Sequence, residues 1–105
     1  MRCRTCQPLP EEVARAAELL GRRWVLASLW ASSEAGAVRF NEFKQALETI
    51  PPRTLAARLA ELEDAGILER RVIDTRPPRV EYRLTDPGRR LGALVDAMRA
   101  YAAHA

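Results

Sequence analysis

The 105-residue chain has few of the residues from which catalytic and metal sites are built. His104 is its one histidine, and Cys3 and Cys6 are its two cysteines. A Ser/His/Asp set, a glycine-rich phosphate loop and a clustered carboxylate pair are all missing, so we expect no enzyme. One Cys-x-x-Cys pair supplies half of a structural zinc site, so we expect neither metal nor cofactor, although a site shared between two chains is conceivable.

Long apolar segments are also missing. No run approaches the roughly 20 residues needed to span a bilayer. Residues 1–8 lack the apolar core of a signal peptide. We therefore expect a cytoplasmic protein that does not enter membranes, in which both cysteines are thiols rather than a structural disulfide.

Lysine is scarce too, with Lys44 as the single example, but abundant arginine makes the chain mildly basic. Lys and Arg total 17 against 14 Asp and Glu, which gives a net charge of +3 and a pI near 9.4. Hydrophobic residues make up 48% and charged residues 30%, as in one soluble globular domain covering residues 1–105. This balance permits nucleic-acid binding without requiring it, and so small a domain would gain from association with a second copy.

Residues 50–66 contain the clearest helix signal. Pro52 suits a first helical turn and Gly66 suits the position just past a helix end. Leu55, Leu59 and Leu62 recur at i, i+4 and i+7, which predicts one buried stripe. An ordinary amphipathic surface helix would look the same, but this one could also enter a DNA major groove. Its small, cationic N-terminal face consists of Arg53, Thr54, Ala57 and Arg58.

Upstream, the sequence predicts a flexible arm over residues 1–9, a helix over 11–20 and a second helix from Arg23 to about Ser32. We expect Trp24 and Trp30 to anchor the core from that second helix. A loop over 33–38 precedes a short helix over 39–47, with Asn41 as its N-cap. Because residues 48–51 join that helix to the next by a tight connection, the pair is arranged as a helix-turn-helix.

Downstream, the period changes to that of strands. Residues 67–74 and 79–84 predict two antiparallel strands, and residues 75–78 form the tip because neither proline there can donate to a ladder. The stiff tip presents Arg76 and Arg79. Two helices followed by a basic hairpin describe an α+β, mostly helical winged helix-turn-helix domain with a two-stranded wing.

A last helix is predicted over residues 86–104. Its apolar stripe either folds back on the helix over 11–20 or meets the same stripe of a second chain. A two-fold homodimer fits best, because it would bury more apolar area and set two reading helices about 34 Å apart. The predicted dimer residues on the two helices are Val13, Ala17, Leu20, Leu91, Leu94, Val95, Met98 and Tyr101.

Several motifs belong to one recognisable pattern that covers nearly the whole chain from Cys6. The run that ends Pro-Arg-Val-Glu-Tyr-x-Leu-Thr and is followed by Gly88 is especially specific. The matching segments are Leu19-Leu20-Gly21-Arg22-Arg23-Trp24, Arg39-Phe40-Asn41-Glu42-Phe43, Arg53-Thr54-Leu55 with Arg58-Leu59 and Glu61-Leu62, Ala65-Gly66-Ile67-Leu68-Glu69-Arg70, and Pro77-Pro78-Arg79-Val80-Glu81-Tyr82-Arg83-Leu84-Thr85.

In these segments the chain resembles the HxlR-type transcription regulators, a branch of the MarR-like winged-helix proteins. The resemblance implies a homodimer that binds a short inverted repeat, commonly near its own gene, and responds to cellular stress. Two positions depart from the family pattern, which usually has Lys in place of Arg23 and Ser in place of Pro51. Since Pro51 has no hydroxyl to cap the helix or reach a phosphate, we expect altered contacts there.

The expected DNA contacts follow from residue chemistry. Arginine pairs naturally with guanine, while Thr or Ala meets the thymine methyl group. A helix start near Asn41 offers backbone N–H groups to a phosphate, and arginines on a wing engage phosphate or a narrow minor groove. The candidate DNA-binding residues are Arg39, Asn41, Arg53, Thr54, Ala57, Arg58, Arg76 and Arg79.

The cysteine pair is the candidate sensor. Arg2 and Arg4 flank Cys3 and Cys6, and positive neighbours raise the thiolate fraction that an electrophile or oxidant attacks. The resemblance implies that Cys6 is the sensing residue, with Cys3 as a resolving partner. Two inert thiols remain an alternative, whereas a thioredoxin-type enzyme is rejected because its motif should follow a strand.

We expect a homodimeric repressor that binds an inverted repeat in DNA and responds through Cys6 to electrophile, aldehyde or redox stress. Two alternatives remain open. One is a winged-helix regulator without thiol sensing, which responds to a small molecule or acts constitutively, and the other is a winged-helix module that binds protein.

Overall fold

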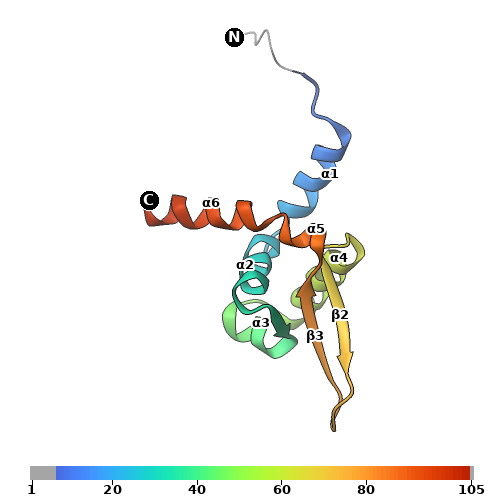
Figure 1. The fold of residues 1–105 in the computed structure, drawn as a ribbon. Helices are drawn as coiled ribbons and strands as arrows, with labels where there is room; N and C mark the ends of the chain where they lie inside the picture. Colours follow the sequence, from blue (N-terminus) through green and yellow to red (C-terminus); the bar gives the residue numbers. More distant parts are fainter. Residues whose placement is uncertain (1–6, 105) are drawn as a thin grey trace.

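The chain folds as a winged helix with two helices projecting from it (Figure 1). The computed structural model describes residues 7–104. In Figure 1 the β2–β3 hairpin projects from one end of the body, while α1 and α6 leave the other end. The expected α+β, mostly helical winged helix-turn-helix fold is thereby confirmed. Its elements are α1 (Glu11–Leu20), α2 (Val25–Ala35), β1 (Ala37–Arg39), α3 (Phe40–Ala46), α4 (Pro52–Asp64), β2 (Leu68–Ile73), β3 (Arg79–Leu84), α5 (Asp86–Arg89) and α6 (Gly92–Ala103).

The sheet has three antiparallel strands in the order β1-β3-β2. The hairpin is confirmed, with Leu68 opposite Leu84 and Ile73 opposite Arg79. The expected loop over 33–38 is wrong, because α2 continues to Ala35 and β1 then pairs with β3. Three residues are too few to show a strand period, so this pairing was not visible in the sequence. Val38 of β1 is 2% exposed and ties the sheet to the core.

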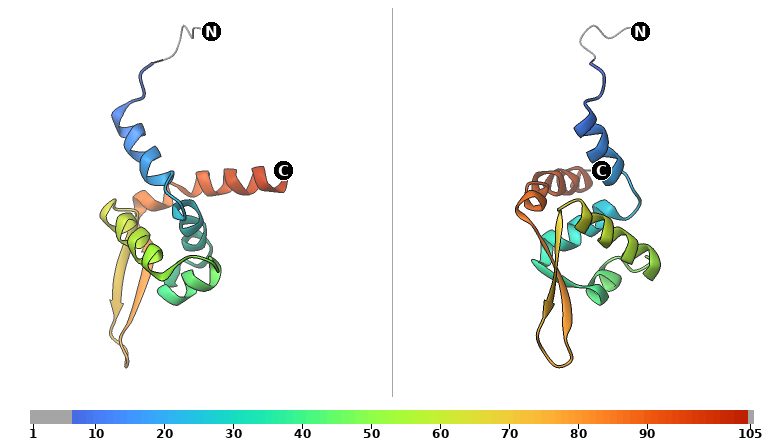
Figure 2. Two further views of the ribbon diagram at one scale, coloured as in Figure 1. Left: turned by 180° about the vertical axis from the view of Figure 1, so that it is seen from behind. Right: turned by 90° about the vertical axis from the view of Figure 1, so that its right-hand side faces the viewer.

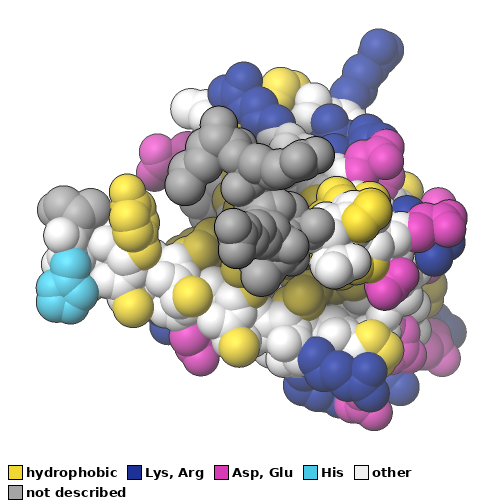
Figure 3. All heavy atoms as spheres, turned by 90° about the horizontal axis from the view of Figure 1, so that it is seen from above, with side chains coloured by type: hydrophobic (Ala, Val, Ile, Leu, Met, Phe, Trp, Pro, Cys, Tyr) yellow, Lys and Arg dark blue, Asp and Glu magenta, His cyan; other side chains and the backbone are white. Residues whose placement is uncertain are grey.

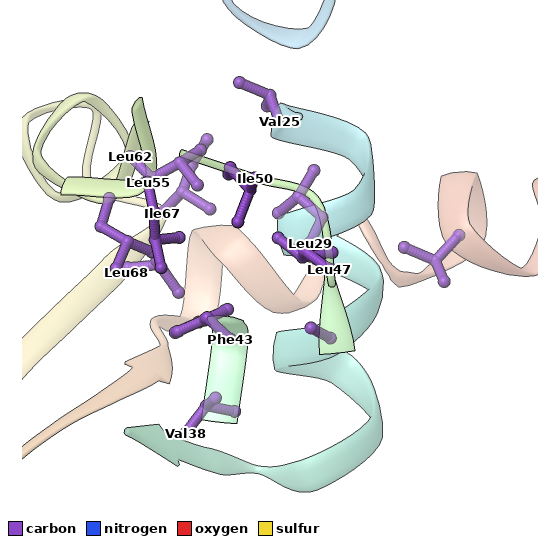
Figure 4. Packing of buried hydrophobic residues seen from close by; sticks show 13 residues of the cluster. Val25, Leu29, Val38, Phe43, Leu47, Ile50, Leu55, Leu62, Ile67 and Leu68 are labelled. Carbon is purple, nitrogen blue, oxygen red and sulfur yellow. The ribbon is translucent and has the colours of Figure 1, made fainter. Parts of the chain in front are cut away.

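The core lies where α2, α3 and α4 meet the sheet (Figure 4). Leu55, Leu59 and Leu62 of α4 are at most 1% exposed, as their spacing predicts. Phe43 of α3 is fully buried and meets the edge of Tyr82 at a ring distance of 6.0 Å. The wholly apolar cluster consists of Val25, Leu29, Ala31, Val38, Phe43, Leu47, Ile50, Leu55, Leu59, Leu62, Ile67, Leu68 and Val95.

The tryptophans do not both anchor this core. Trp24 precedes α2 with φ 79° and is partly buried against the cluster, whereas Trp30 is 38% exposed. The buried face of α2 instead includes Ser28 and Ser32, whose hydroxyls donate to the carbonyls of Trp24 and Ser28 at 2.8 and 2.9 Å. Serines on the buried face hide the helical period of α2, which explains the wrong expectation for Trp30.

The two helices of the helix-turn-helix begin differently from one another. Asn41 is not the N-cap of α3, because Arg39 takes that position and its N–H donates to Glu42 Oε1 at 2.8 Å. The bounds of α4 agree with its sequence signals. Pro52 is its first residue, and Gly66 has the left-handed φ of 77° typical of a residue just past a helix end.

The single helix expected over 86–104 is two helices. Thr85 caps α5 by accepting the Gly88 N–H at 3.1 Å, and its own hydroxyl donates to the Gly66 carbonyl. After α5 the backbone hydrogen bonds follow the i→i+3 pattern, as in Leu91 N–H to Gly88 O at 3.0 Å, before α6 begins. The bond from Thr85 to the Gly66 carbonyl anchors α5 to the turn after α4. Within residues 7–104, no helix is long and apolar enough to cross a membrane.

Candidate nucleic-acid interface

The solvent-facing side of α4 is small and carries one cation at its start. Arg53 and Ala57 are exposed there, as predicted. Ala56 and Ala60 are exposed beside them and extend the face, which a helical projection from the three leucines could have shown. Side chains this small let a helix backbone come close to another surface. In the last turn Asp64 is exposed, so the basic part of this face is confined to the first turns.

Arg58 does not lie on that face. Its side chain is 20% exposed, and its Nε donates to the Arg23 carbonyl at 3.0 Å. The guanidinium also donates to both carboxylate oxygens of Glu61, at 2.9 and 3.2 Å. Its hydrogen bond to the Arg23 carbonyl places Arg58 on the flank of α4 that faces the turn between α1 and α2. Thr54 shares this flank and is half-buried.

Three other predicted residues meet between α3 and the wing. Arg39 and Asn41 at the start of α3, together with Arg79 at the start of β3, line a hollow of about 480 Å³. Arg39 and Asn41 are both exposed. Arg79 is held by Glu81, with its Nε 3.4 Å from the carboxylate. The fold therefore gathers residues that are 40 positions apart in the chain into one polar surface.

The wing is a basic hairpin with a partly neutralised stem. Arg71 pairs with Glu69 at 3.5 Å, and Arg83 pairs with Glu81 at 3.8 Å. Arg76 is exposed at the tip, and its guanidinium has no carboxylate partner among residues 7–104. The views in Figure 2 show the hairpin extending beyond α3 and α4. Its tip can therefore reach a ligand that lies along these helices.

The projecting helices α1 and α6 carry apolar surface. Val13 and Tyr101 are 47% and 77% exposed, and Ala17 is exposed as well. Figure 3, which looks onto this end of the molecule, shows hydrophobic and uncharged atoms along α6. Val95 is different, because at 3% exposure it belongs to the core of its own chain. The remaining members of the predicted set, Leu20, Leu91, Leu94 and Met98, are partly buried.

Cys3 and Cys6 lie outside the described residues. The described part of the chain also contains no group of three or more His, Cys, Asp and Glu side chains placed to hold a metal ion. The two exposed surfaces, on α4 and between α3 and the wing, carry arginine, amide and hydroxyl groups. Such groups bind phosphate and base edges.

Helix α4 is buried on one side and presents a small cationic face on the other, and a basic hairpin lies beside it. This arrangement defines a winged helix-turn-helix protein of the nucleic-acid-binding class. Comparison with known families agrees. Residues 19–105 match the model of the HxlR-like helix-turn-helix family. The chain belongs to this family, whose members are DNA-binding transcriptional regulators and not enzymes.

Its relatives are regulators of the same type. Over 81 residues the chain is 38% identical to the uncharacterized HTH-type transcriptional regulator YvaP of Bacillus subtilis, covering 77% of this chain and 74% of YvaP. It is 41% identical over 85 residues to the uncharacterized HTH-type transcriptional regulator Mb3122 of Mycobacterium bovis. That match covers 81% of this chain and 52% of Mb3122, so the chain spans about half the length of the mycobacterial relative.

Solved structures with this fold include two regulators whose redox state was defined. The reduced form of the transcriptional regulator YodB from B. subtilis has a TM-score of 0.80 and 35% identity, covering 90% of this chain and 92% of YodB. The redox regulator HypR in its oxidized form has a TM-score of 0.83 and 34% identity, covering 90% of this chain and 96% of HypR.

Proposed function

We propose that this protein is a homodimeric, sequence-specific repressor that binds an inverted repeat in double-stranded DNA. The small cationic face of α4 carries the proposal. In it α4 is the reading helix, which lies in the major groove with Arg53 against a guanine and Ala57 against a thymine methyl group. The alanines around Ala57 allow the helix to approach base edges closely. The family supports this assignment, because its members are helix-turn-helix regulators.

The surrounding basic residues supply phosphate contacts in this proposal. Arg39 and Asn41 meet the backbone at the start of α3, and Thr54 meets it at the edge of the reading helix. Arg76 and Arg79 follow the neighbouring backbone or minor groove from the wing. The structure gives Arg58 partners inside the protein, so we remove it from the set of direct contacts.

The proposed dimer joins two copies through α1 and α6. Support comes from the exposure of Val13 and Tyr101 on helices that leave the body opposite the wing. A two-fold axis at that end would present both reading helices to one face of DNA, about one turn or 34 Å apart. Val95 is excluded from this interface because it is buried in its own protomer.

We also propose that Cys6 senses electrophiles, aldehydes or oxidants and that Cys3 resolves the oxidised form. Arg2 and Arg4 favour the thiolate, and HypR and YodB are a redox regulator and a regulator studied after diamide treatment. With diamide, two thiols give up two protons and two electrons, and an S–S bond forms. With an electrophile, the thiolate adds to the reactive carbon without electron transfer.

A DNA shift assay tests both parts. The probe is the region upstream of the protein's own gene, at two salt concentrations, with and without diamide or a thiol-reactive aldehyde. We expect salt-dependent binding by the wild type that the reagents weaken, and binding by Cys6→Ser that they do not. Indifference of the wild type to the reagents would remove the sensor role alone. Absence of salt-dependent binding would instead favour a protein-binding module.

A further inference from the structure

Arg58 connects the reading helix to the turn between α1 and α2 by one hydrogen bond, and it makes two more within the helix. Arg58 donates through Nε to the Arg23 carbonyl at 3.0 Å and through its guanidinium to Glu61 at 2.9 and 3.2 Å. Glu61 also pairs with Arg22, whose guanidinium lies 3.5 Å from the carboxylate. Arg58 and Glu61 on α4 are therefore both tied to the turn between α1 and α2.

That turn is a firm point of attachment. Trp24 has φ 79° and ψ −10°, a left-handed conformation that bulky residues rarely adopt. It is held there by several contacts at once. The Arg23 guanidinium lies 5.2 Å from the centre of the Trp24 ring, and the Ser28 hydroxyl and N–H both bond to the Trp24 carbonyl at 2.8 and 2.9 Å. These contacts hold the backbone of the turn in place, so the Arg23 carbonyl that accepts the hydrogen bond from Arg58 has a fixed position.

A direct DNA contact through Nε or Nη1 of Arg58 would break the bonds to the Arg23 carbonyl and to Glu61 and leave these acceptors without this donor. A contact through Nη2 would keep those bonds, but it would bring the negatively charged Glu61 carboxylate close to the same phosphate. A side chain that is 20% exposed also has little surface to offer a ligand. Arg53, on the exposed side of the same helix, has neither restriction.

We propose that Arg58 and Glu61 are positioning residues that fix the rotation of the reading helix about its axis, and that Arg58 does not touch DNA. The three buried leucines decide which face of the helix points into the core. The hydrogen bonds add direction, because the planar guanidinium must meet the Arg23 carbonyl and Glu61 together. The proposal rests on the proposed DNA-reading role of α4.

The test compares two arginines on the one helix. Arg58→Met, Arg58→Lys and Arg53→Met are measured by fluorescence anisotropy on the upstream duplex and on an unrelated duplex of equal length, across a salt series. The salt slope is the slope of the logarithm of the binding constant against the logarithm of the salt concentration. For Arg58→Met we expect roughly tenfold weaker binding to the upstream duplex, unchanged binding to the unrelated one and an unchanged salt slope. Arg53 is placed for a guanine and the adjacent phosphate, so for Arg53→Met we expect weaker binding to both duplexes, with the larger loss on the upstream one, and a slope lower by about 0.9.

Two further variants separate positioning from contact. Lysine keeps the charge of Arg58 but lacks the planar set of donors that meets the Arg23 carbonyl and Glu61 together, so Arg58→Lys should behave like Arg58→Met, whereas a phosphate contact would survive in it. Glu61→Gln removes a negative charge, which would strengthen binding if Arg58 were a contact released by the change. We expect it to weaken binding instead, with little additional loss in the double variant Arg58→Met/Glu61→Gln.

The outcomes are distinct. A slope lowered by about 0.9 in Arg58→Met, or tighter binding by Glu61→Gln, would overturn the positioning role, while weaker binding by Arg53→Met would still support α4 as the reading helix. Wild-type protein without salt-dependent binding would overturn the proposed function together with this inference. If Arg58→Met unfolds, Arg58→Lys and Glu61→Gln still decide the matter, and circular dichroism at the assay temperature establishes which variants are folded.

Discussion

Gly88 joins the C-terminal part of the chain to the winged body. It is buried in α5, where a Cβ atom would lie 2.2 Å from the Ile67 carbonyl oxygen and 3.1 Å from a Leu84 methyl group. The Thr85 hydroxyl bonds to the neighbouring Gly66 carbonyl. The absence of a side chain at Gly88 therefore decides how closely α5 approaches the turn after the reading helix.

Replacement of this glycine should cost stability. Gly88→Ala puts a methyl group against backbone that cannot move aside cheaply, so we expect a loss of about 1–3 kcal/mol in the free energy of unfolding. Gly92→Ala is the matched control, because a Cβ atom there would meet nothing within 4 Å beyond its own helix and chain neighbours, and alanine favours helix. Urea denaturation compares the two. Equal midpoints would show that the close approach at Gly88 is unimportant.

At the scale of single residues, the sequence predicted positions governed by local backbone chemistry and missed those governed by distant partners. Pro52 and Gly66 follow from the constraints of a helix start and a helix end. The engagement of Arg58 with the Arg23 carbonyl depends on a residue 35 positions away. A helical projection alone shows the flank on which Arg58 lies, but not what that flank meets.

The wing projects from the body beyond α3 and α4. Glu69 and Glu81 pair with Arg71, Arg79 and Arg83 on its stem, whereas Arg70 on the stem and Arg76 at the tip are exposed without a carboxylate partner in the described chain, so the tip keeps its positive charge. Arg76 carries that charge on a turn stiffened by two prolines and by the Thr75 hydroxyl, which donates to the Pro77 carbonyl at 2.8 Å. A stiff tip loses little conformational freedom when it binds.

Removal of the tip cation should weaken binding without changing specificity. For Arg76→Ala we expect weaker binding to every duplex and a salt slope lower by about 0.9, because one phosphate contact is lost. Arg90→Ala is the control, since Arg90 is also exposed but follows α5 at the end opposite the wing. Anisotropy titrations over a salt series measure both. Equal slopes for Arg76→Ala and wild type would remove the wing tip from the contacts.

Among the elements, the long periodic ones were predictable and the short or interrupted ones were not. Helix α1, the reading helix and the β2–β3 hairpin each show a repeated pattern over six or more residues. Strand β1 has three residues and exists because β3 offers it a ladder. The break between α5 and α6 likewise depends on the packing of Gly88 against Ile67, which no local period reveals.

At the scale of the whole molecule, the helices α1 and α6 carry exposed apolar surface. Within the described chain, no residue of α1 is fully buried, although its apolar residues fall on one side. The apolar stripe of α6 was predictable, but the sequence did not show which of its residues pack into the core of the same chain and which stay exposed. Val95 is used by the core of its own chain, and Tyr101 at the far end of the helix is left outside.

A charge placed on this surface should separate the proposed dimer. For Val13→Asp and Tyr101→Asp we expect a monomer in sedimentation velocity at concentrations where the wild type is a dimer, because each change puts an unpaired charge into an apolar interface. Binding to an inverted repeat should fall more than binding to a half-site. Val72→Asp is the control, since Val72 is 61% exposed but lies on the wing. An unchanged sedimentation coefficient in both helix variants would contradict the assignment.

The alanines on the reading helix have a consequence for how this regulator can change. Ala56, Ala57 and Ala60 make little contribution to the core, so larger polar side chains can replace them at small cost in stability. In the proposed complex, each replacement would add a new hydrogen-bonding group to the side that faces the groove, while Leu55, Leu59 and Leu62 keep the helix in place. The helix is in this respect a template on which new operator preferences can evolve, or be engineered, one residue at a time.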